Sequence, residues 1–368
     1  MQEHQKNVIP VMFIGIIWFM LALFCWRKPS DEISKSERRE LEQMPELTSD
    51  TLLSGEFMKD FERYAQDQFP RRTTFRKLKA YTRFNAFAQK DNNGIYLEDG
   101  YAAKLEYPLN ESSVLSAADK FRCLYEKYMK EQNLKVYLSV IPDKGYYLAA
   151  PNGYPSMDYG RLFEIMKSHT EFAEYVDISD VLELEDYYYT DIHWRQEKLI
   201  KVAEKFGETM HISNELSLKY DVIESEAPFY GVYYGQSALP LEPEKLYYLT
   251  NDTIRDCTVY NVETNQTTPV YDMEKMKGKD PYEGYLSGAA PLLFIENPHA
   301  ASRKELIVFR DSFGSSLIPL LLEGYSKVTL VDLRYIASDY LENFIIFDNQ
   351  EVLFLYSTPV LNSSMVLK

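Results

Sequence analysis

The side chains best suited to chemistry lie in the stretch YYYTDIHW, residues 187–194, where one of only five histidines follows an aspartate. Asp191 and His193 are two positions apart, and side chains at i and i+2 point the same way only where the backbone is extended or looped. In such a backbone the carboxylate can hold the imidazole as a general base. The alternative is that Asp191 caps a helix starting near Arg195 and that His193 is incidental.

A candidate nucleophile lies in the stretch RDSFGSSL, residues 310–317, directly after the apolar run ELIVF. Ser312 falls where a strand gives way to a helix, and Gly314 follows two residues later. Such a turn exposes the hydroxyl at the rim of a sheet, and the unpaired amides at the helix start can stabilise an oxyanion. Taken alone, however, a serine at this point is more typical of a helix cap.

A serine nucleophile needs a base and an acid, which narrows the choice of histidine. The other histidines of the large C-terminal part lie on the polar side of a helix, at a helix end or in a loop. They are His169, His211 and His299. Only His193 has a carboxylate two residues upstream and follows a strand-like aromatic run. Asp191, His193 and Ser312 are therefore the candidate acid, base and nucleophile.

The order of the predicted elements explains how these residues can meet. From about residue 112, amphipathic helices alternate with short apolar strands, as in SAADKFRCLYEKYMKEQ followed by LKVYLSVIP. Alternating strands and helices predict an α/β fold, with a parallel sheet sandwiched by helices. Ligands of such sheets bind at the carboxyl ends of the strands. A tyrosine-rich run at about 215–290, with Pro, Gly and Asn turns, predicts a β-rich insertion.

Three smaller elements are also predicted from local patterns. NNGIYLEDGYAAKL alternates around Asp99-Gly100 and predicts a β-hairpin. YVDISDVL, residues 175–182, predicts a short strand, and IASDYLENFIIF, residues 336–347, predicts a helix.

The first 28 residues predict a transmembrane signal anchor. Val8 to Trp26 form an uncharged apolar stretch, close to the ~20 residues that span a bilayer, and no cleavage site of small residues is present. Residues 29–75 predict a charged, weakly helical stalk followed by a helix beside the domain, and residues 76–368 predict the catalytic domain with its insertion. More basic residues follow the stretch than precede it, so the positive-inside rule places the large domain in the cytoplasm.

Composition argues against two kinds of partner. A formal net charge of −16 leaves too little positive charge to bind a nucleic-acid backbone. The three cysteines and five histidines show no spacing typical of a zinc site. Neither a metal nor a cofactor is therefore predicted.

Several motifs together resemble the DHHW protein family, whose signature reads Asp-His-His-Trp after an upstream Tyr and Thr. YYYTDIHW matches this signature, and further matches are LLSGEFMKDFERYAQDQFPRR, NGIYLEDGYAAKL, VIPDKGYYL and VFRDSFGSSLIPLLLEGYSKVTLVDLRY. The family is similar to the alginate O-acetylation proteins, which have an SGNH-hydrolase-like fold. The resemblance covers nearly everything after the apolar stretch. It implies this fold and an Asp–His–Ser triad made of Asp191, His193 and Ser312.

The same resemblance implies a function and a location. It implies a serine O-acetyltransferase acting on a cell-surface or exported polysaccharide, anchored in the cell membrane by one span with its catalytic domain outside the cytoplasm. A membrane-bound O-acyltransferase partner is implied as the source of the acetyl group. This location disagrees with the positive-inside count, and we follow the resemblance. Two alternatives stay open: a carbohydrate acetyl esterase with the same triad, and a non-catalytic polysaccharide-binding subunit of an acetylation complex.

Two departures from the family pattern concern the site. Ile192 replaces the first histidine of the signature, which is compatible with a base at the second. In YLSGAAPLLFI, residues 285–295, Gly288 is kept, but an alanine stands where relatives tend to carry asparagine. The oxyanion hole is therefore expected to rest on backbone amides, those of Ser312 or Phe313 together with Gly288.

Aromatic residues beside the triad are candidates for substrate binding. The chain contains 30 tyrosines, and aromatic faces can contact sugars, although half-buried packing is their commoner role. Trp194 and Tyr189 flank the triad stretch and are predicted to stack on sugar, with burial in the core as the alternative.

Overall fold

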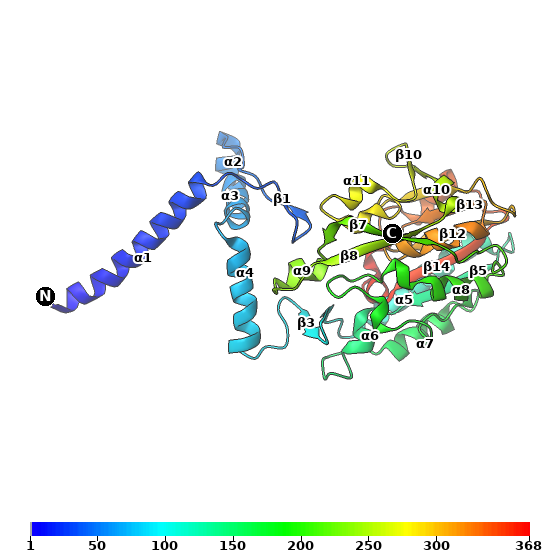
Figure 1. Ribbon diagram of the computed structural model, residues 1–368, viewed down its shortest axis with the longest axis horizontal. Coiled ribbons are helices and arrows are strands. Elements are labelled where there is room, and N and C mark those ends of the chain that lie inside the picture. The colour runs from blue at the N-terminus through cyan, green and yellow to red at the C-terminus, as the bar shows by residue number, and fades with distance from the viewer. Residues whose placement is uncertain (1) are drawn as a thin grey trace.

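An eight-stranded sheet forms the centre of the protein, in the order β10-β9-β11-β13-β12-β14-β5-β6 (Figure 1). The computed structural model describes residues 2–368, without the side chains of residues 2–7 and Trp26. The strands from β13 to β6 are parallel, and β9, β10 and β11 add an antiparallel edge. The strands are β5 Val136–Ile141, β6 Glu174–Tyr175, β9 Thr258–Asn261, β10 Gln266–Pro269, β11 Leu292–Glu296, β12 Glu305–Arg310, β13 Lys327–Val331 and β14 Glu351–Ser357.

Helices cover both faces of the sheet because the side chains of the central strands alternate between two hydrophobic cores. The main covering helices are α5 Glu111–Leu124, α7 Tyr159–His169 and α8 Ile200–Thr209. In β12, Leu306 and Val308 belong to the core that includes α8, whereas Ile307 and Phe309 belong to the core that includes α5 and α7. The predicted α/β fold, with a mostly parallel sheet between helices, is confirmed.

Hairpins and short helices connect these elements. The hairpins are β1–β2 (Ile33–Ser34, Arg39–Glu40), β3–β4 (Ile95–Glu98, Tyr101–Lys104) and β7–β8 (Asp221–Phe229, Glu244–Thr250). The short α-helices are α6 Lys144–Leu148, α9 Val232–Ser237, α10 Asp252–Asp256, α11 Met273–Met276, α12 Gly314–Leu317 and α13 Thr358–Asn362. The 3-10 helices are η3 Leu184–Asp186, η4 Gln196–Lys198, η5 Pro281–Gly284, η6 Ile318–Gly324, η7 Ser338–Asn343 and η8 Ser364–Val366, and the π-helical segments are η1 Thr82–Ala86 and η2 Tyr125–Met129.

The predicted hairpin around Asp99-Gly100 is present as β3–β4. Both turn residues have a positive φ, 49° and 83°. A two-residue turn needs this conformation to match the twist of its strands.

The tyrosine-rich region at about 215–290 contains the predicted strands but is only in part an insertion. Strands β7 and β8 pair with each other in a separate hairpin. Strand β9, by contrast, pairs with β11 and carries β10 with it into the central sheet. The second half of the region therefore extends the main sheet.

Two predicted elements are shorter than expected. Of the strand predicted at residues 175–182, only Tyr175 belongs to β6 (Glu174–Tyr175), which pairs with β5. The carboxylate of Asp177 accepts the amide of Ser179 and turns the chain away. The predicted helix at 336–347 is reduced to η7. At its end, residues 345 and 347 are buried and residue 346 is exposed, which is the alternation of an extended segment.

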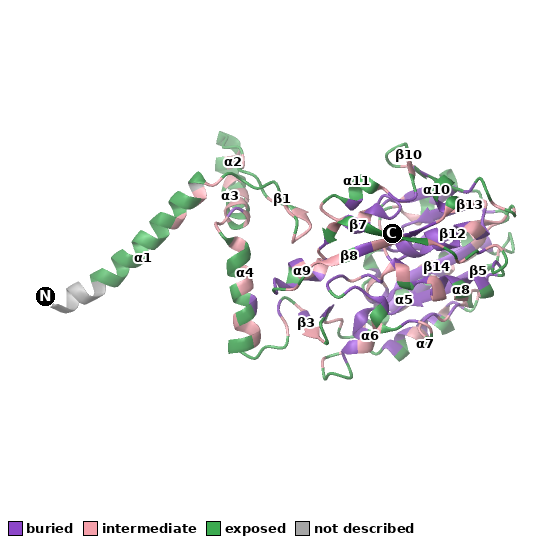
Figure 2. Cartoon of the chain, viewed as in Figure 1, coloured by how far each residue is buried: buried purple, intermediate pink, exposed green. Residues whose placement is uncertain are grey.

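The N-terminal part begins with the long helix α1 (Gln2–Arg27), which extends away from the body of the protein (Figure 1). Its described side chains are largely exposed (Figure 2). Its segment Val8–Cys25 is the one described helix that is long and apolar enough to cross a membrane. Helices α2 Ser49–Ser54, α3 Glu56–Asp67 and α4 Arg72–Tyr81 follow.

The predicted stalk is packed onto the sheet domain rather than free of it. The sequence predicts a weakly helical segment at residues 30–50, but this segment carries the β1–β2 hairpin. Glu37 in the hairpin pairs with Arg76 at 2.7 Å, and Arg76 donates to the carbonyl of Gly235 at 2.6 Å. A Cβ on Gly235 would lie 2.6 Å from the carbonyl oxygen of Ser36, so glycine is needed for this close approach.

Candidate active site

Ser312 lies on the turn between β12 and α12, at the carboxyl edge of the parallel strands. The carboxylate of Asp311 shapes this turn. One of its oxygens accepts the amide of Phe313 at 3.0 Å, and the other accepts the amide and hydroxyl of Ser357, at 2.8 and 2.6 Å. Ser357 ends β14, so two neighbouring strands fix the turn. Ser312 itself is partly exposed, which leaves its hydroxyl within reach of a substrate.

The loop that carries Asp191 and His193 is not helical. Tyr187 and Trp194 pair in an isolated antiparallel bridge, so the residues between them form a closed loop. Within this loop the carboxylate of Asp191 accepts the amide of His193 at 3.0 Å. The looped backbone that Asp191 needs in order to orient His193 is therefore present.

The structure brings the three predicted residues into one hydrogen-bonded relay. Nε2 of His193 lies 2.8 Å from the hydroxyl oxygen of Ser312, and Nδ1 lies 2.6 Å from Oδ1 of Asp191. His193 is 7% exposed and Asp191 0%. The aspartate end of the relay is therefore excluded from solvent, whereas Ser312 at the other end is accessible. In this geometry a histidine can take the serine proton while the carboxylate fixes its tautomer.

Arg38 holds the acid end of the relay and was not predicted. It lies in the β1–β2 hairpin with a positive φ of 55°, and its Nη1 lies 2.5 Å from the second oxygen of Asp191. Its Nη2 pairs with Asp280. Burial alone raises the pKa of Asp191, but the charges of Arg38 and His193 more than offset this, so that pKa lies well below its usual range.

The aromatic ring of Tyr282 stacks on the imidazole of His193. The ring centroids of Tyr282 and His193 lie 3.8 Å apart, with their planes 9° from parallel. The Tyr282 hydroxyl is fixed in turn by a hydrogen bond of 2.8 Å with Ser316 on the nucleophile side. Stacking limits rotation of the imidazole, so Nε2 stays directed at Ser312. Tyr282 was also not predicted, because it lies in the short 3-10 helix η5, where the sequence carries no local signal of a site.

Two of the three backbone amides predicted as oxyanion donors form hydrogen bonds within the protein. The amide of Phe313 donates to the Asp311 carboxylate at 3.0 Å, and the amide of Gly288 donates to the carbonyl of Tyr285 at 3.1 Å. The amide of Ser312 has no hydrogen-bond partner within the described residues 2–368. The geometry therefore leaves the amide of Ser312, the other predicted donor, free for an oxyanion.

Trp194 is buried and links two parts of the site, a role called the brace below, whereas Tyr189 is exposed and remains a candidate for sugar binding. Trp194 is 0% exposed, so it cannot stack on a sugar. Its Nε1 donates to the carbonyl of Phe313 at 3.1 Å and to the hydroxyl of Ser316 at 2.9 Å, which ties the histidine loop to the serine turn. Tyr189 is 42% exposed and stacks on Tyr101. Its contact with sugar stays a prediction.

We expect Trp194→Phe to lower kcat and to reduce the free energy of unfolding by about 1–3 kcal/mol, because it removes a buried donor shared by two acceptors. Steady-state turnover of an activated ester and chemical denaturation measure the two effects. The matched control is Tyr325→Phe, which removes a hydroxyl bonded to Glu351 at 2.8 Å. This control should lose stability and keep its kcat. An unchanged kcat in Trp194→Phe would show that the brace is irrelevant to the relay.

Gly231 lies where no side chain fits against the Asp191 loop. A Cβ there would lie 2.2 Å from the carbonyl of Thr190 and 2.4 Å from the amide nitrogen of Asp191. The next residue, Val232, donates its amide to the Asp191 carboxylate at 2.8 Å. The loop and the start of α9 are therefore in direct contact.

We expect Gly231→Ala to lower kcat by roughly 10- to 100-fold, because a displacement of about 1 Å in a catalytic group has costs of this size. Ester turnover by the folded variant measures the effect. Gly160→Ala is the control, since its Cβ would meet only the Asp158 carboxylate, at 3.5 Å. Equal kcat values in the two variants would contradict the role assigned to Gly231.

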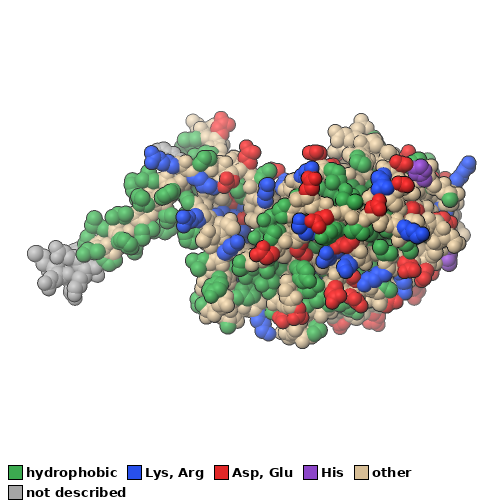
Figure 3. All heavy atoms as spheres, in the orientation of Figure 1, with side chains coloured by type: hydrophobic (Ala, Val, Ile, Leu, Met, Phe, Trp, Pro, Cys, Tyr) green, Lys and Arg blue, Asp and Glu red, His purple; other side chains and the backbone are tan. Residues whose placement is uncertain are grey.

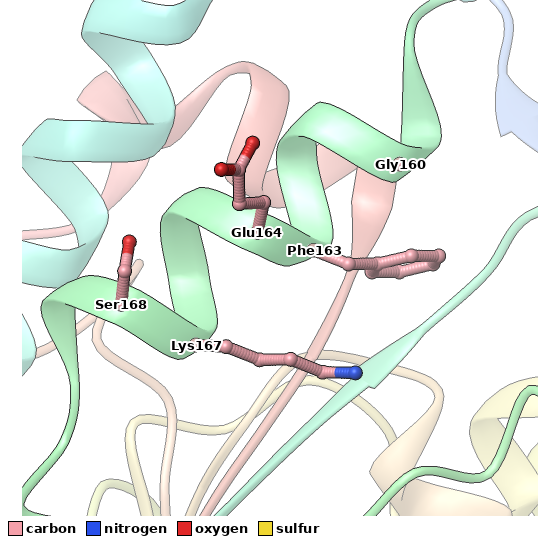
Figure 4. Close-up of a pocket in the computed structure, with 5 residues that line it drawn as sticks. All are labelled: Gly160, Phe163, Glu164, Lys167 and Ser168. Carbon is pink, nitrogen blue, oxygen red and sulfur yellow. The ribbon is translucent and has the colours of Figure 1, made fainter.

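A hollow on the surface of α7 does not form a second site. It is lined by Gly160, Phe163, Glu164, Lys167 and Ser168. Figure 4 shows the side chains of Phe163 and Lys167 pointing to one side of the helix and those of Glu164 and Ser168 to another. No polar groups converge there on a ligand. Within the described residues no group of three or more metal-ligating side chains occurs either.

The fold and the relay together define an α/β protein with serine, histidine and aspartate joined at the carboxyl edge of a parallel sheet. A DHHW family protein from Eubacterium siraeum has the same fold, with a TM-score of 0.58 and 18% identity over 75% of this chain and 94% of its own. Bacillus cereus PatB1 with a sulfonyl adduct gives a TM-score of 0.59 and 19% identity over 73% and 95%. The predicted resemblance is therefore confirmed for the fold, which is SGNH-hydrolase-like.

A more distant structural neighbour is the O-acetyltransferase domain of Pseudomonas putida AlgJ, with a TM-score of 0.44 and 13% identity over 73% of this chain and 92% of its own. No protein-family model matches the sequence, and no curated protein matches it. Beyond the short motifs shared with DHHW proteins, the likeness to these proteins is thus one of structure.

Proposed function

We propose that the protein is a membrane-anchored serine O-acyltransferase that transfers acetyl groups to a polysaccharide outside the cytoplasm. The observation that carries the proposal is the relay from Ser312 through His193 to Asp191, of which only the serine end is open. The sequence resemblance to DHHW proteins supports acetyl transfer as the reaction. The sulfonyl adduct named for Bacillus cereus PatB1 fits a nucleophilic hydroxyl in a protein of this fold.

The first half-reaction acylates the serine. Ser312 Oγ attacks the carbonyl carbon of the acetyl donor while Nε2 of His193 takes the hydroxyl proton. The amide of Ser312 stabilises the oxyanion, and Asp191 stabilises the imidazolium. When the intermediate collapses, the leaving group departs with the proton from His193. Ser312 then carries an acetyl ester, and the relay is ready for an acceptor.

The second half-reaction moves the acetyl group to a sugar hydroxyl. His193 takes the proton of that hydroxyl as the sugar oxygen attacks the acetyl-serine, and the proton returns to Ser312 when its ester bond breaks. Water in place of the sugar would make the protein an esterase. Acetyl transfer therefore requires an acceptor that competes with water. The exposed ring of Tyr189, in the same loop as Asp191 and His193, is the proposed sugar contact.

The cellular setting is part of the proposal. The apolar segment Val8–Cys25 is long enough to serve as a single-pass anchor. Acetyl groups would reach Ser312 through a membrane-bound O-acyltransferase partner, as the sequence resemblance implies. The catalytic domain would then work beside the membrane, on a polymer at the cell surface or on its way out.

The test is to trap the acyl-enzyme. The full-length protein in nanodiscs is incubated with an activated acetyl ester, and peptide mass spectrometry locates the adduct. We expect acetylation of Ser312, loss of the adduct in Ser312→Ala, and slower formation in His193→Ala. A sulfonyl fluoride should block the same residue. Candidate glycans then separate a transferase, which acetylates sugar, from an esterase, which releases only acetate.

The absence of any adduct on Ser312 in a folded protein would overturn the proposal. The protein would then be better described as a polysaccharide-binding subunit that keeps the fold. Circular dichroism and a cooperative unfolding transition establish folding in the same samples.

A further inference from the structure

Helix α4 presents a row of large apolar side chains to solvent. Phe75, Leu78 and Tyr81 follow at intervals of three, so they share one side of the helix, and they are 51%, 58% and 61% exposed. Phe87, a little beyond the helix, is 69% exposed. Figure 3 shows hydrophobic side chains gathered over the lower part of α4. A continuous apolar row of this kind marks a contact surface.

Basic residues surround this apolar row. Residues 71–83 contain six lysines and arginines and no acidic residue. The opposite side of α4 holds it to the body through the Arg76–Glu37 ion pair and the buried Ala80. Lys77 and Lys79 flank the row, and neither forms an ion pair with another described residue of the chain. The outer face of α4 is therefore both apolar and positively charged.

Helix α4 lies close to the candidate membrane span through its neighbour α3. The apolar face of α3 and the end of α1 enclose a groove of about 670 Å³, lined among others by Trp18, Phe61 and Tyr64. Since Val8–Cys25 is the apolar segment of α1, α3 lies where that segment would leave the hydrocarbon. The chain then passes directly into α4 at Arg72. The exposed apolar row on α4 therefore follows directly on α3, the helix that packs beside the candidate membrane span.

A lipid surface matches the outer face of α4 better than a protein surface does. Helices that lie in a bilayer interface carry apolar side chains on one side and lysines at its edges, whose long stems let the ammonium groups reach the headgroups. An aromatic residue such as Tyr81 is typical of that layer. The positive charge favours anionic headgroups. The remainder of a chain with a net charge of −16 would be repelled by the same surface.

We propose that α4 lies in the headgroup layer of an anionic bilayer, with Phe75, Leu78 and Tyr81 immersed and with Lys77 and Lys79 contacting lipid phosphates. This inference rests on the membrane attachment in the proposed function. The inner side of α4 holds the hairpin that carries Arg38. A fixed α4 would therefore set the orientation of the whole catalytic centre relative to the bilayer.

The experiment measures the accessibility of single thiols on α4. The full-length protein, with its three native cysteines replaced, receives Leu78→Cys in the row or Thr73→Cys on another exposed side of the helix. Each variant is placed in phosphatidylglycerol-containing nanodiscs and treated with a charged, membrane-impermeant maleimide. We expect the thiol at position 78 to react roughly tenfold more slowly than the one at position 73, because immersion excludes the reagent.

A charge variant tests the role of the lysines. Lys77→Gln combined with Lys79→Gln should raise the reactivity at position 78 in anionic nanodiscs, as should a change to purely zwitterionic lipid. Equal reactivity at positions 78 and 73 in nanodiscs that retain the protein would overturn the proposal. Protection that appears only after another membrane protein is added would also overturn it, in favour of a protein partner. Acetylation of Ser312, measured in the same samples, reports separately on the proposed function.

Discussion

Ser312→Ala is expected to lower kcat for acyl transfer by about 10⁶, the size of loss known when the serine of a catalytic triad is removed. In the proposed mechanism this hydroxyl carries the acetyl group, so the burst of product from the first half-reaction should vanish as well. Rapid mixing with an activated acetyl ester measures both effects. Folding should be preserved, because the Ser312 side chain is partly exposed and its one side-chain hydrogen bond within the described residues is to His193.

Ser315→Ala is the matched control for this experiment. Ser315 lies in α12, directly after the turn that carries Ser312, and its hydroxyl accepts a hydrogen bond from Arg310 at 2.9 Å. This variant should lose some stability and still form the acyl-enzyme. Turnover by Ser312→Ala at the wild-type rate would rule out the serine mechanism.

Arg38→Ala is expected to reduce the free energy of unfolding by about 3–5 kcal/mol, the usual cost of removing one partner from a buried ion pair. Arg38 is the cation between Asp191 and Asp280, and without it two carboxylates face each other. Activity should change too. Arg38 fixes the carboxylate of Asp191, which orients His193, so kcat should fall when this carboxylate is free to move.

The stability of Arg38→Ala should also depend on pH in a defined direction. In the native protein the pKa of Asp191 lies below its ordinary value of 3.8. The carboxylate therefore stabilises the fold fully above that value, and this contribution is lost only as the pH falls below it. In the variant, burial is no longer offset by Arg38 and raises the pKa. Acid unfolding, followed by circular dichroism, should then begin at a higher pH.

Arg39→Ala is the control that separates an effect on the relay from an effect on the stability of the hairpin. Arg39 is in the same hairpin but pairs with Asp67, at 2.5 Å, away from the triad. Its removal should weaken the hairpin and leave kcat unchanged. If Arg38→Ala and Arg39→Ala lowered kcat equally, the contact between Arg38 and Asp191 would have no part in catalysis.

The parts of the fold that local patterns could predict are those set by neighbouring residues. Alternating apolar residues place Leu306 and Ile307 in opposite cores, so the parallel sheet and its covering helices followed from periodicity. The relay could be predicted because Asp191 and His193 are close in sequence and Ser312 ends a strand. The burial of Trp194 could not, since its two partners lie 119 and 122 residues away.

Arg38 shows most clearly what local patterns miss. It stands in a charged segment that resembles a solvated stalk, and 153 residues separate it from Asp191. Only the folded chain brings the two together. A fragment that begins at the predicted domain boundary, residue 76, would lack Arg38 and Glu37. Kinetic work on a shortened protein should therefore retain the hairpin from residue 30 onward.

The hydrogen bonds between Asp311 and Ser357 have a consequence for how the protein is made. Chains emerge from the ribosome with the N-terminus first, and Ser357 follows Asp311 by 46 residues. The turn that presents Ser312 is therefore left without this clamp until β14 has been synthesised and has paired with β12. A nascent chain that still lacks β14 should not react with acetyl donors at Ser312. Acylation should therefore depend on the folding of β14 against β12.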